Sequence, residues 1–304
     1  MASTSGTSTP PVALPRVLLV SLARANLVLA ASVAASSWMV QALAGLPPDP
    51  VPPAVSFLVM YAVYSLDRAA EPEADLRTHP ERARFARRHA RRMRLSALGA
   101  YALALLAAST HGGDTVAAAL LPLAVVLPYS FPFLPARVAR RVGFARLKEV
   151  LVLKNAVVAF TLAATPVLLA LSAAEGVPGR GPALAVGAFL FGRWCVNTVF
   201  FDVRDETGDR ENGVRTIPVA IGRRATLRAL HALNALLAAL ALSAPLLGWA
   251  PARFALLAAS SVYAWAYLRR FAAGGDPHFL CDVVSDGELL VLAAIVLAAG
   301  ASPG

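Results

Sequence analysis

The residues with the clearest capacity for chemistry are two clusters of carboxylates in a chain that has only 18 acidic residues. Within each cluster the spacing is three to four residues, which places the side chains on one face of a helix. Like charges at this spacing repel each other, and a hard divalent cation would offset that repulsion. Mg²⁺ is bound through one or two carboxylates, with water and substrate phosphate oxygens completing its shell. The clusters consist of Asp67, Glu71 and Asp75, and of Asp202, Asp205 and Asp209.

Two interpretations of these clusters stay open at this point. Acidic residues at helix ends are often solvated partners of nearby arginines, and either cluster alone fits that description. Two clusters at helical spacing, at the mouths of two helices, favour a shared site for Mg²⁺ and a diphosphate. An apolar tail attached to that diphosphate would then lie among the helices.

The composition indicates an integral membrane protein. Hydrophobic residues make up 58% of the 304 residues and charged residues 15%, with a mean hydropathy of +0.62, whereas a soluble domain is about 25% charged. Too little polar surface remains to coat a water-soluble particle. Cys195 and Cys281 form neither a disulfide framework nor a metal-binding spacing.

Apolar runs long enough to cross about 30 Å of hydrocarbon as helices occur nine times. We therefore predict an all-α, polytopic membrane protein, a bundle of nine transmembrane helices with a cavity on the cytosolic side. Residues 1–11 form a polar tail that we expect to be disordered, and 12–304 form one transmembrane domain. The predicted spans are 17–44, 51–66, 95–111, 115–134, 149–173, 182–203, 225–247, 251–268 and 284–302.

Charge separates the two sides of this bundle. The loops after the even-numbered spans are rich in arginine, whereas those after the odd-numbered spans contribute only Arg180 and, at the start of the eighth span, Arg253. The positive-inside rule then predicts a cytoplasmic N-terminus and a site facing the cytoplasm, in the cell membrane. The net charge of +10 is thus a topology signal that suits contact with membrane lipid, and nucleic-acid binding is not expected.

The sequence around the second cluster reads DVRDETGDRENGVRTIPVAIG, from Asp202 to Gly222. It resembles the second aspartate-rich motif of the UbiA superfamily of membrane prenyltransferases, in which D-x-x-x-D (here Asp205 and Asp209) precedes a glycine and a T-x-P-V-x-x-G stretch. The glycines and the proline also suit a turn that reverses the chain, and both interpretations can hold together. The further matching residues are Gly208, Gly213, Thr216, Pro218, Val219 and Gly222.

The first cluster departs from the N-x-x-x-D-x-x-x-D pattern of the same family. Aspartate stands at position 67, where asparagine is usual, and glutamate at position 71, where aspartate is usual. Pro72 also removes a backbone donor and disfavours helix at Glu71. The helical-face argument is therefore weaker here than for the second cluster.

The resemblance implies an Mg²⁺-dependent enzyme that moves a prenyl group from an isoprenoid diphosphate to a lipophilic acceptor. Both acidic clusters would be catalytic as metal ligands. The alternative is a UbiA-type terpene cyclase, which uses the same metal site on a single prenyl diphosphate. A transporter predicts charges near the bilayer midplane, and a CDP-alcohol phosphotransferase requires a D-G-x-x-A-R core that Asp286-Gly287 does not continue. Acceptor, chain length and oligomeric state stay open.

Five further residues are candidates for substrate binding, because ionisable groups inside spans are functional candidates by default. Lys154 would reach a diphosphate oxygen, or it snorkels to the headgroups. Arg215 would bind diphosphate or pair with an acidic neighbour. Arg193 and Asn197 share a helix with the second cluster, and Tyr64 would steady a cation. We attribute a third acidic group to charge complementarity at a helix N-terminus: Asp282, Asp286 and Glu288.

Overall fold

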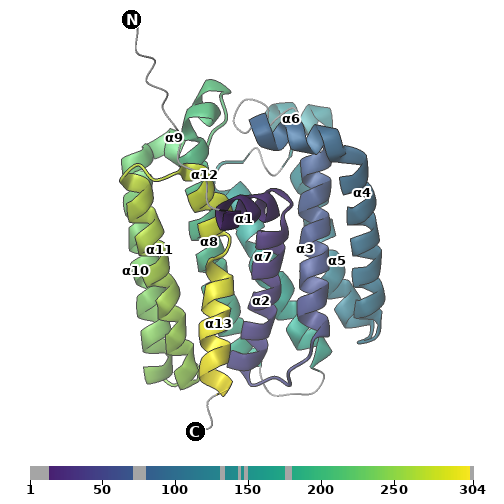
Figure 1. Cartoon of the computed structure of the whole chain (residues 1–304), viewed down its shortest axis with the longest axis vertical. Coiled ribbons are helices and arrows are strands. Elements are labelled where there is room, and N and C mark those ends of the chain that lie inside the picture. The colour runs from purple at the N-terminus through teal and green to yellow at the C-terminus, as the bar shows by residue number, and fades with distance from the viewer. Residues whose placement is uncertain are drawn as a thin grey trace, which may run out of the picture.

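The computed structural model describes residues 14–70, 80–130, 134–142, 145–146, 150–174 and 180–301. These residues form helices and connecting turns and contain no strand, which confirms the all-α prediction. The long helices run side by side along one axis (Figure 1). The elements are α1 (Leu14–Arg24), α2 (Leu27–Ala44), α3 (Val51–Ala70), α4 (Pro80–Ser109), α5 (Gly113–Ser130), α6 (Ala136–Val142), α7 (Leu153–Ala173), α8 (Arg180–Glu211), α9 (Ile217–Ile221), α10 (Arg223–Leu246), η2 (Ala252–Leu257), α11 (Ala258–Ala272), α12 (Pro277–Phe279), η3 (Leu280–Ser285) and α13 (Glu288–Ala301).

Five helical segments of the described chain are long and apolar enough to cross a membrane: α2, α7, α8, α10 and the run Pro277–Gly300; α5 is a shorter apolar helix. Large apolar side chains also face outward, as Leu98, Leu103 and Leu106 do on α4. Outward apolar surface of this kind suits lipid rather than water. The chain is a multi-pass membrane protein, and the count of nine spans stays a prediction.

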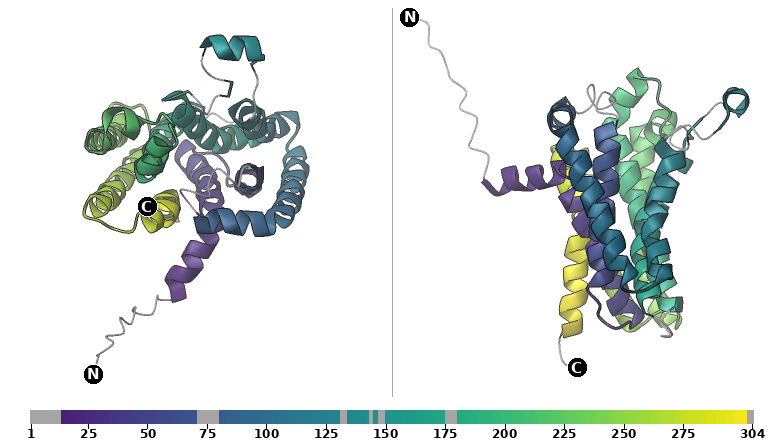
Figure 2. Two further views of the ribbon diagram at one scale, coloured as in Figure 1. Left: turned by 90° about the horizontal axis from the view of Figure 1, so that it is seen from above. Right: turned by 90° about the vertical axis from the view of Figure 1, so that its right-hand side faces the viewer.

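The first predicted span, 17–44, is wrong as a single helix. The chain breaks at Asn26, whose φ of 62° is left-handed, a conformation that asparagine tolerates better than most residues. Asn26 is buried and its Nδ2 donates to Ser65 Oγ at 3.3 Å. As a result α2 runs along the bundle, whereas α1 lies across its upper end and projects sideways (Figures 1 and 2).

Two helices extend well beyond their predicted spans. Helix α8 has 32 residues and at 1.5 Å per residue is about 48 Å long, so it exceeds the hydrocarbon thickness of about 30 Å. Its acidic C-terminal part therefore continues the membrane helix out of the apolar layer. Helix α4 begins at Pro80 with an arginine-rich half before its apolar half.

The last span also begins earlier than predicted. Asp276 caps the helical run by accepting from the backbone N–H groups of His278 and Phe279. The run continues through the π-helical segment η3 into α13. Asp282 and Asp286 therefore lie within this run, several residues past its start, and the attribution of these two aspartates to a helix N-terminus is wrong.

One end of the bundle carries α1, α6, α9 and α12, while the C-terminus lies at the other end (Figure 1). The arginine-rich parts of the described chain, such as the first half of α4 and α6, lie at the same end as α1. In the core, α2 packs against α3, α7, α8 and α13. Ser37 on α2 and Ser56 on α3 are buried and hydrogen-bonded at 2.9 Å, a contact that draws membrane helices together.

Candidate active site

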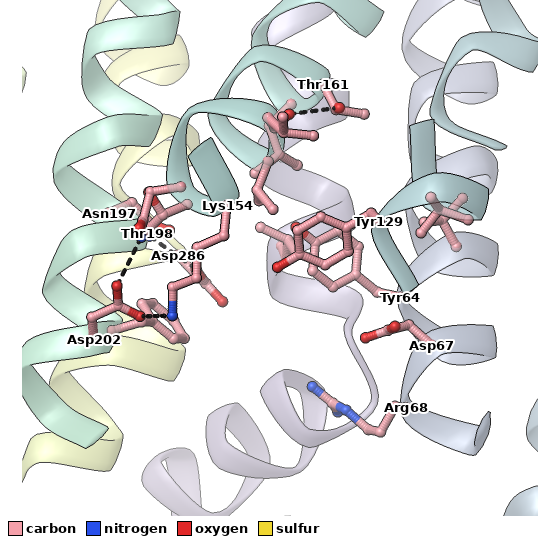
Figure 3. Close-up of a pocket in the computed structure, with 18 of the residues that line it drawn as sticks. Tyr64, Asp67, Arg68, Tyr129, Lys154, Thr161, Asn197, Thr198, Asp202 and Asp286 are labelled. Carbon is pink, nitrogen blue, oxygen red and sulfur yellow. Dashed lines mark hydrogen bonds and ion pairs between the residues drawn. The ribbon is translucent and has the colours of Figure 1, made fainter. Parts of the chain in front are cut away.

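A cavity of about 860 Å³ opens among α2, α3, α5, α7, α8 and η3. Its walls are partly aliphatic, with Val125, Val126, Val157, Val158 and Leu162 among the lining side chains, while charged groups gather elsewhere on the lining. Figure 3 shows the labelled polar side chains directed into this space from several helices. The cavity therefore combines an apolar compartment with a charged region.

Both acidic clusters contribute to this charged region. Asp67 reaches it from α3, and Asp202, Asp205 and Asp209 reach it from α8. Asp67 and Asp202 stand on opposite sides of the cavity, with the Tyr64 side chain between them in the view (Figure 3). Glu71 and Asp75, the remaining members of the first cluster, lie outside the described residues. The fold thus brings together two segments 135 residues apart in sequence.

Asp202 is buried and held by two neighbours from α7. Lys154 Nζ donates to its Oδ1 at 2.8 Å, and Asn155 Nδ2 donates to its Oδ2 at 3.0 Å. Figure 3 shows the interaction of Lys154 with Asp202 as a dashed line. Lys154 is therefore turned into the cavity toward the acidic cluster, and not out toward lipid headgroups.

Asp205 is held by its own neighbour in sequence. Arg204 donates from Nε to Oδ1 of Asp205 at 2.7 Å and from Nη2 to Oδ2 at 2.9 Å. The same guanidinium lies 4.5 Å from the centre of the Phe201 ring and donates to Asp282 Oδ1 of η3 at 2.6 Å. This carboxylate is fixed on both oxygens by charge-assisted hydrogen bonds.

The chain reverses just after Asp209, as the glycines in this stretch suggest. The backbone C=O of Asp209 accepts from Val214 N–H at 2.8 Å. Gly213 and Gly222 have φ angles of +69° and +84°, which glycine adopts without steric cost. This turn leaves Asp209 on the lining of the cavity.

The structure does not bring all of the candidate binding residues to the cavity. Asn197 and Tyr64 line it. Arg193 lies deeper, where its side chain is 1% exposed and its Nη2 is 2.6 Å from Glu288 Oε1. Arg215 is exposed and is not among the lining residues.

Comparison with known proteins decides the family, because the model of the UbiA prenyltransferase family matches residues 33–278. The chain belongs to the UbiA prenyltransferase family. This confirms the resemblance drawn from the second acidic motif. No curated protein matches the chain.

Several solved structures of UbiA proteins share the fold at low sequence identity. The chain is similar to a UbiA homologue from Archaeoglobus fulgidus bound to GPP and Mg²⁺, with a TM-score of 0.62, 16% identity and coverage of 93% of this chain and 100% of that one. The chain is also similar to an apo UbiA homologue from Aeropyrum pernix K1, with a TM-score of 0.62, 16% identity and coverage of 90% of this chain and 96% of that one. For a digeranylgeranylglyceryl phosphate synthase the TM-score is 0.56 and the identity 14%, with coverage of 94% of this chain and 98% of that one.

Two cavity residues of this UbiA protein were assigned to a helix N-terminus from the sequence and not to the site. Asp282 and Asp286, on and just after η3, both line the cavity. Asp286 accepts from Asn197 Nδ2 at 3.0 Å, and Figure 3 shows the two side chains close together. Their spacing of four residues was the available signal, since it puts both carboxylates on one helix face.

The donor set is compatible with a hard cation and a diphosphate. The lining carries six carboxylates and three basic side chains, so the region is acidic enough to take up positive charge. In the described part of the chain, no three His, Cys, Asp or Glu side chains are grouped closely enough to bind a metal ion by themselves. Mg²⁺ does not require such a group, because water and substrate phosphate complete its shell. Asn155 Oδ1 is buried without a hydrogen-bond partner among the described residues and adds an oxygen acceptor on the lining.

Proposed function

We propose that this UbiA-family protein is an Mg²⁺-dependent intramembrane prenyltransferase that moves a prenyl group from an isoprenoid diphosphate to a lipophilic acceptor. One observation carries the proposal: Asp67 and the aspartates of α8 meet on a single cavity that also has an aliphatic compartment. A diphosphate headgroup suits the charged region and a prenyl chain suits the aliphatic walls. The Archaeoglobus fulgidus homologue with this fold binds GPP or DMAPP together with Mg²⁺, which supports the same substrate class here.

The acidic residues act as ligands in this mechanism. Mg²⁺, when bound, neutralises the diphosphate and so favours it as a leaving group. The first cluster would hold one ion and the second cluster another: Asp67, Glu71 and Asp75, and Asp202, Asp205 and Asp209. Because Asp202 and Asp205 are already held by hydrogen bonds to Lys154, Asn155 and Arg204, these two carboxylates need little reorganisation when charge develops.

Lys154 supplies a positive charge beside Asp202 and is the strongest candidate for a direct contact to the diphosphate. The aliphatic walls exclude water while the allylic carbon–oxygen bond breaks, which prevents hydrolysis. Tyr64 and Tyr129 turn aromatic rings toward the cavity (Figure 3), and ring faces attract a developing carbocation. Asn197 shapes the polar side of the pocket. Arg193 and Arg215 have no role in substrate binding in this mechanism.

The cavity lining includes Asp209, Asn212 and Val214, which lie where α8 ends, near α9 at the basic end of the bundle. The positive-inside rule favours a cytoplasmic location for that end. We therefore propose a protein of the cell membrane whose N-terminus and site face the cytoplasm. Both substrates then have natural routes, since a diphosphate approaches from water and a lipophilic acceptor from the bilayer.

The test is incubation of the purified protein in lipid vesicles with labelled C10 to C20 prenyl diphosphates and a panel of acceptors, with and without Mg²⁺. A prenylated acceptor that forms only with Mg²⁺ is the expected result. A hydrocarbon product from the diphosphate alone would identify a cyclase instead. Absence of diphosphate consumption with every substrate would contradict the proposal.

A further inference from the structure

The π-helical segment η3 contributes a side chain that reaches the second acidic motif through an arginine. Asp282 Oδ1 accepts from Arg204 Nη1 at 2.6 Å, which joins residues 78 apart in sequence. Arg204 is almost completely enclosed, with 4% of its side chain exposed, while Asp282 is 28% exposed. π-Helical turns within α-helices are frequently found at functional sites, and this one packs directly on α8.

The geometry of Arg204 is unusual for a residue next to its partner in sequence. Successive residues of a helix project about 100° apart and do not face each other, yet Arg204 covers both oxygens of Asp205. The side chain must fold back along the helix surface to do so. The Phe201 ring lies against one face of the guanidinium, and Asp282 takes the remaining Nη1.

The pair with Arg204 does not by itself prevent Asp205 from binding a cation. A carboxylate has about four acceptor sites, and Arg204 takes one on each oxygen. Ligating carboxylates are ordinarily held by such outer partners, which fix their direction and tune their affinity for the metal.

We propose that Asp282 is a positioning residue for Mg²⁺ binding: it holds Arg204 against Asp205, and so fixes the direction of the Asp205 carboxylate. This inference rests on the proposed function, because it assumes that Asp205 is a metal ligand. Loss of an outer partner of a metal ligand typically weakens metal affinity 10- to 100-fold. We expect Asp282→Asn to raise the Mg²⁺ requirement by about this factor.

The experiment measures binding and turnover separately. An unreactive thio-diphosphate analogue of a prenyl diphosphate is titrated into the full-length protein by calorimetry over a range of Mg²⁺ concentrations. For Asp282→Asn, the Mg²⁺ concentration at half-maximal analogue binding rises about 10- to 100-fold. Turnover at saturating Mg²⁺ stays within a few-fold of the wild-type rate, because Asp282 acts on ion affinity and not on the reacting atoms.

Asp276→Asn is the matched control. Asp276 begins the same helical run and is also paired with an arginine, at 2.5 Å from Arg16, but the pair is 45–47% exposed and is not on the cavity lining. Asparagine retains the helix cap that Asp276 provides. We expect its Mg²⁺ dependence to match that of the wild type.

Arg204→Lys provides a second variant that keeps the charge but not the two-pronged geometry. It should raise the Mg²⁺ requirement as Asp282→Asn does, and Asp282→Glu should restore part of the affinity. The inference is overturned if Asp282→Asn and Arg204→Lys both bind the analogue at wild-type Mg²⁺ concentrations, or if they lose turnover with unchanged binding. A wild-type protein that does not bind the analogue with Mg²⁺ would instead contradict the proposed function.

Discussion

Two helices bring carboxylates to the cavity: α8, which carries Asp202, Asp205 and Asp209, and α3, which carries Asp67. These two sides of the cavity, the α8 wall and the α3 wall, are held by different contacts. On the α8 wall, Asp202 and Asp205 are hydrogen-bonded to Lys154 and Arg204, and deeper in the bundle Arg193 pairs with Glu288 of α13. On the α3 wall, two polar contacts near Asp67 lead to the junction between α1 and α2. Ser65 accepts from Asn26 at 3.3 Å, and Arg68 donates to the backbone C=O of Arg24.

The pairs on the α8 wall show one part of the site that this molecule has preorganised. Charge-assisted pairs are shorter and stronger than neutral hydrogen bonds. Asp202 is held in this way by Lys154 of α7, and Asp205 is held by Arg204, which also donates to Asp282 of η3. The α3 wall is hydrogen-bonded to the junction between α1 and α2, and it also packs along α4 and α2. The two walls also differ in how closely they resemble the family motifs. The cluster on α8 matches its motif closely, whereas the cluster that begins at Asp67 departs from its motif.

The largest expected effect comes from breaking the buried ion pair between Arg193 of α8 and Glu288 of α13. Removal of one partner from a buried ion pair leaves the other uncompensated and costs about 3–5 kcal/mol. Arg193→Ala should therefore lower the free energy of unfolding by about that amount, as measured by equilibrium unfolding in mixed detergent micelles. In this variant Glu288 keeps the hydrogen bond that it accepts from Tyr267 Oη at 3.2 Å, but its buried carboxylate loses the arginine that compensates its charge.

A double-mutant cycle with Glu288→Ala separates the pair from general packing. The changes in unfolding free energy should be strongly non-additive, because each substitution alone removes the same ion pair. Additive losses would mean that Arg193 stabilises the bundle through its methylenes and not through its charge.

The next effect concerns the metal ligands on the same wall. Asp205→Ala or Asp209→Ala removes a proposed ligand and should lower turnover on the order of 10²–10³-fold, as removal of one preorganised electrostatic contact does. Radiolabelled transfer in vesicles measures this loss. Glu206→Ala is the control on the same helix, because Glu206 pairs with Arg210 and Arg223 and is not on the cavity lining. Full activity in both aspartate variants would contradict the proposal that α8 carries the metal ligands.

Local pattern was enough to predict the α8 wall. A continuous helix with offsets of three and seven residues puts Asp202, Asp205 and Asp209 on one face, and α8 indeed runs unbroken from Arg180 to Glu211. The glycines that follow adopt the positive φ angles that a reversal requires. Periodicity and turn chemistry are properties of neighbouring residues, so they can be read in the sequence.

Long-range features were not predictable in this way. Hydropathy gives no sign of a π-helical segment, so the start of the last span was placed too late and Asp282 and Asp286 were attributed to a helix end. The Arg193–Glu288 pair joins residues 95 apart, and no local signal connects them. The break at Asn26 depends on one left-handed residue inside an apolar run, which a hydropathy window averages away.

A smaller effect is expected at Lys154, where α7 fastens the α8 wall. Hydrogen bonds to charged groups contribute about 1.5–3 kcal/mol, which corresponds to roughly 10- to 100-fold in an equilibrium constant. Lys154→Met should raise the KM for the prenyl diphosphate by about that factor, because both the contact to the diphosphate and the pair with Asp202 are lost. Arg210→Met, which removes an exposed cation from α8, should leave KM unchanged. Equal losses in the two variants would indicate general electrostatic attraction of the substrate.

The smallest effect is expected on the α3 wall, at the position where the family pattern has asparagine. Asp67→Asn keeps an oxygen that can ligate a hard cation and removes one negative charge from a cavity that has an excess of carboxylates. We therefore expect turnover and Mg²⁺ dependence to stay within about threefold of the wild type, which corresponds to roughly 0.7 kcal/mol or less. The same aspartate-to-asparagine change at Asp209, on the other wall, should be far more damaging, because that position is an aspartate of the motif shared with the family. If Asp67→Asn is as inactive as Asp209→Asn, both walls contribute equally to catalysis, and the preorganisation seen on α8 is not what distinguishes them.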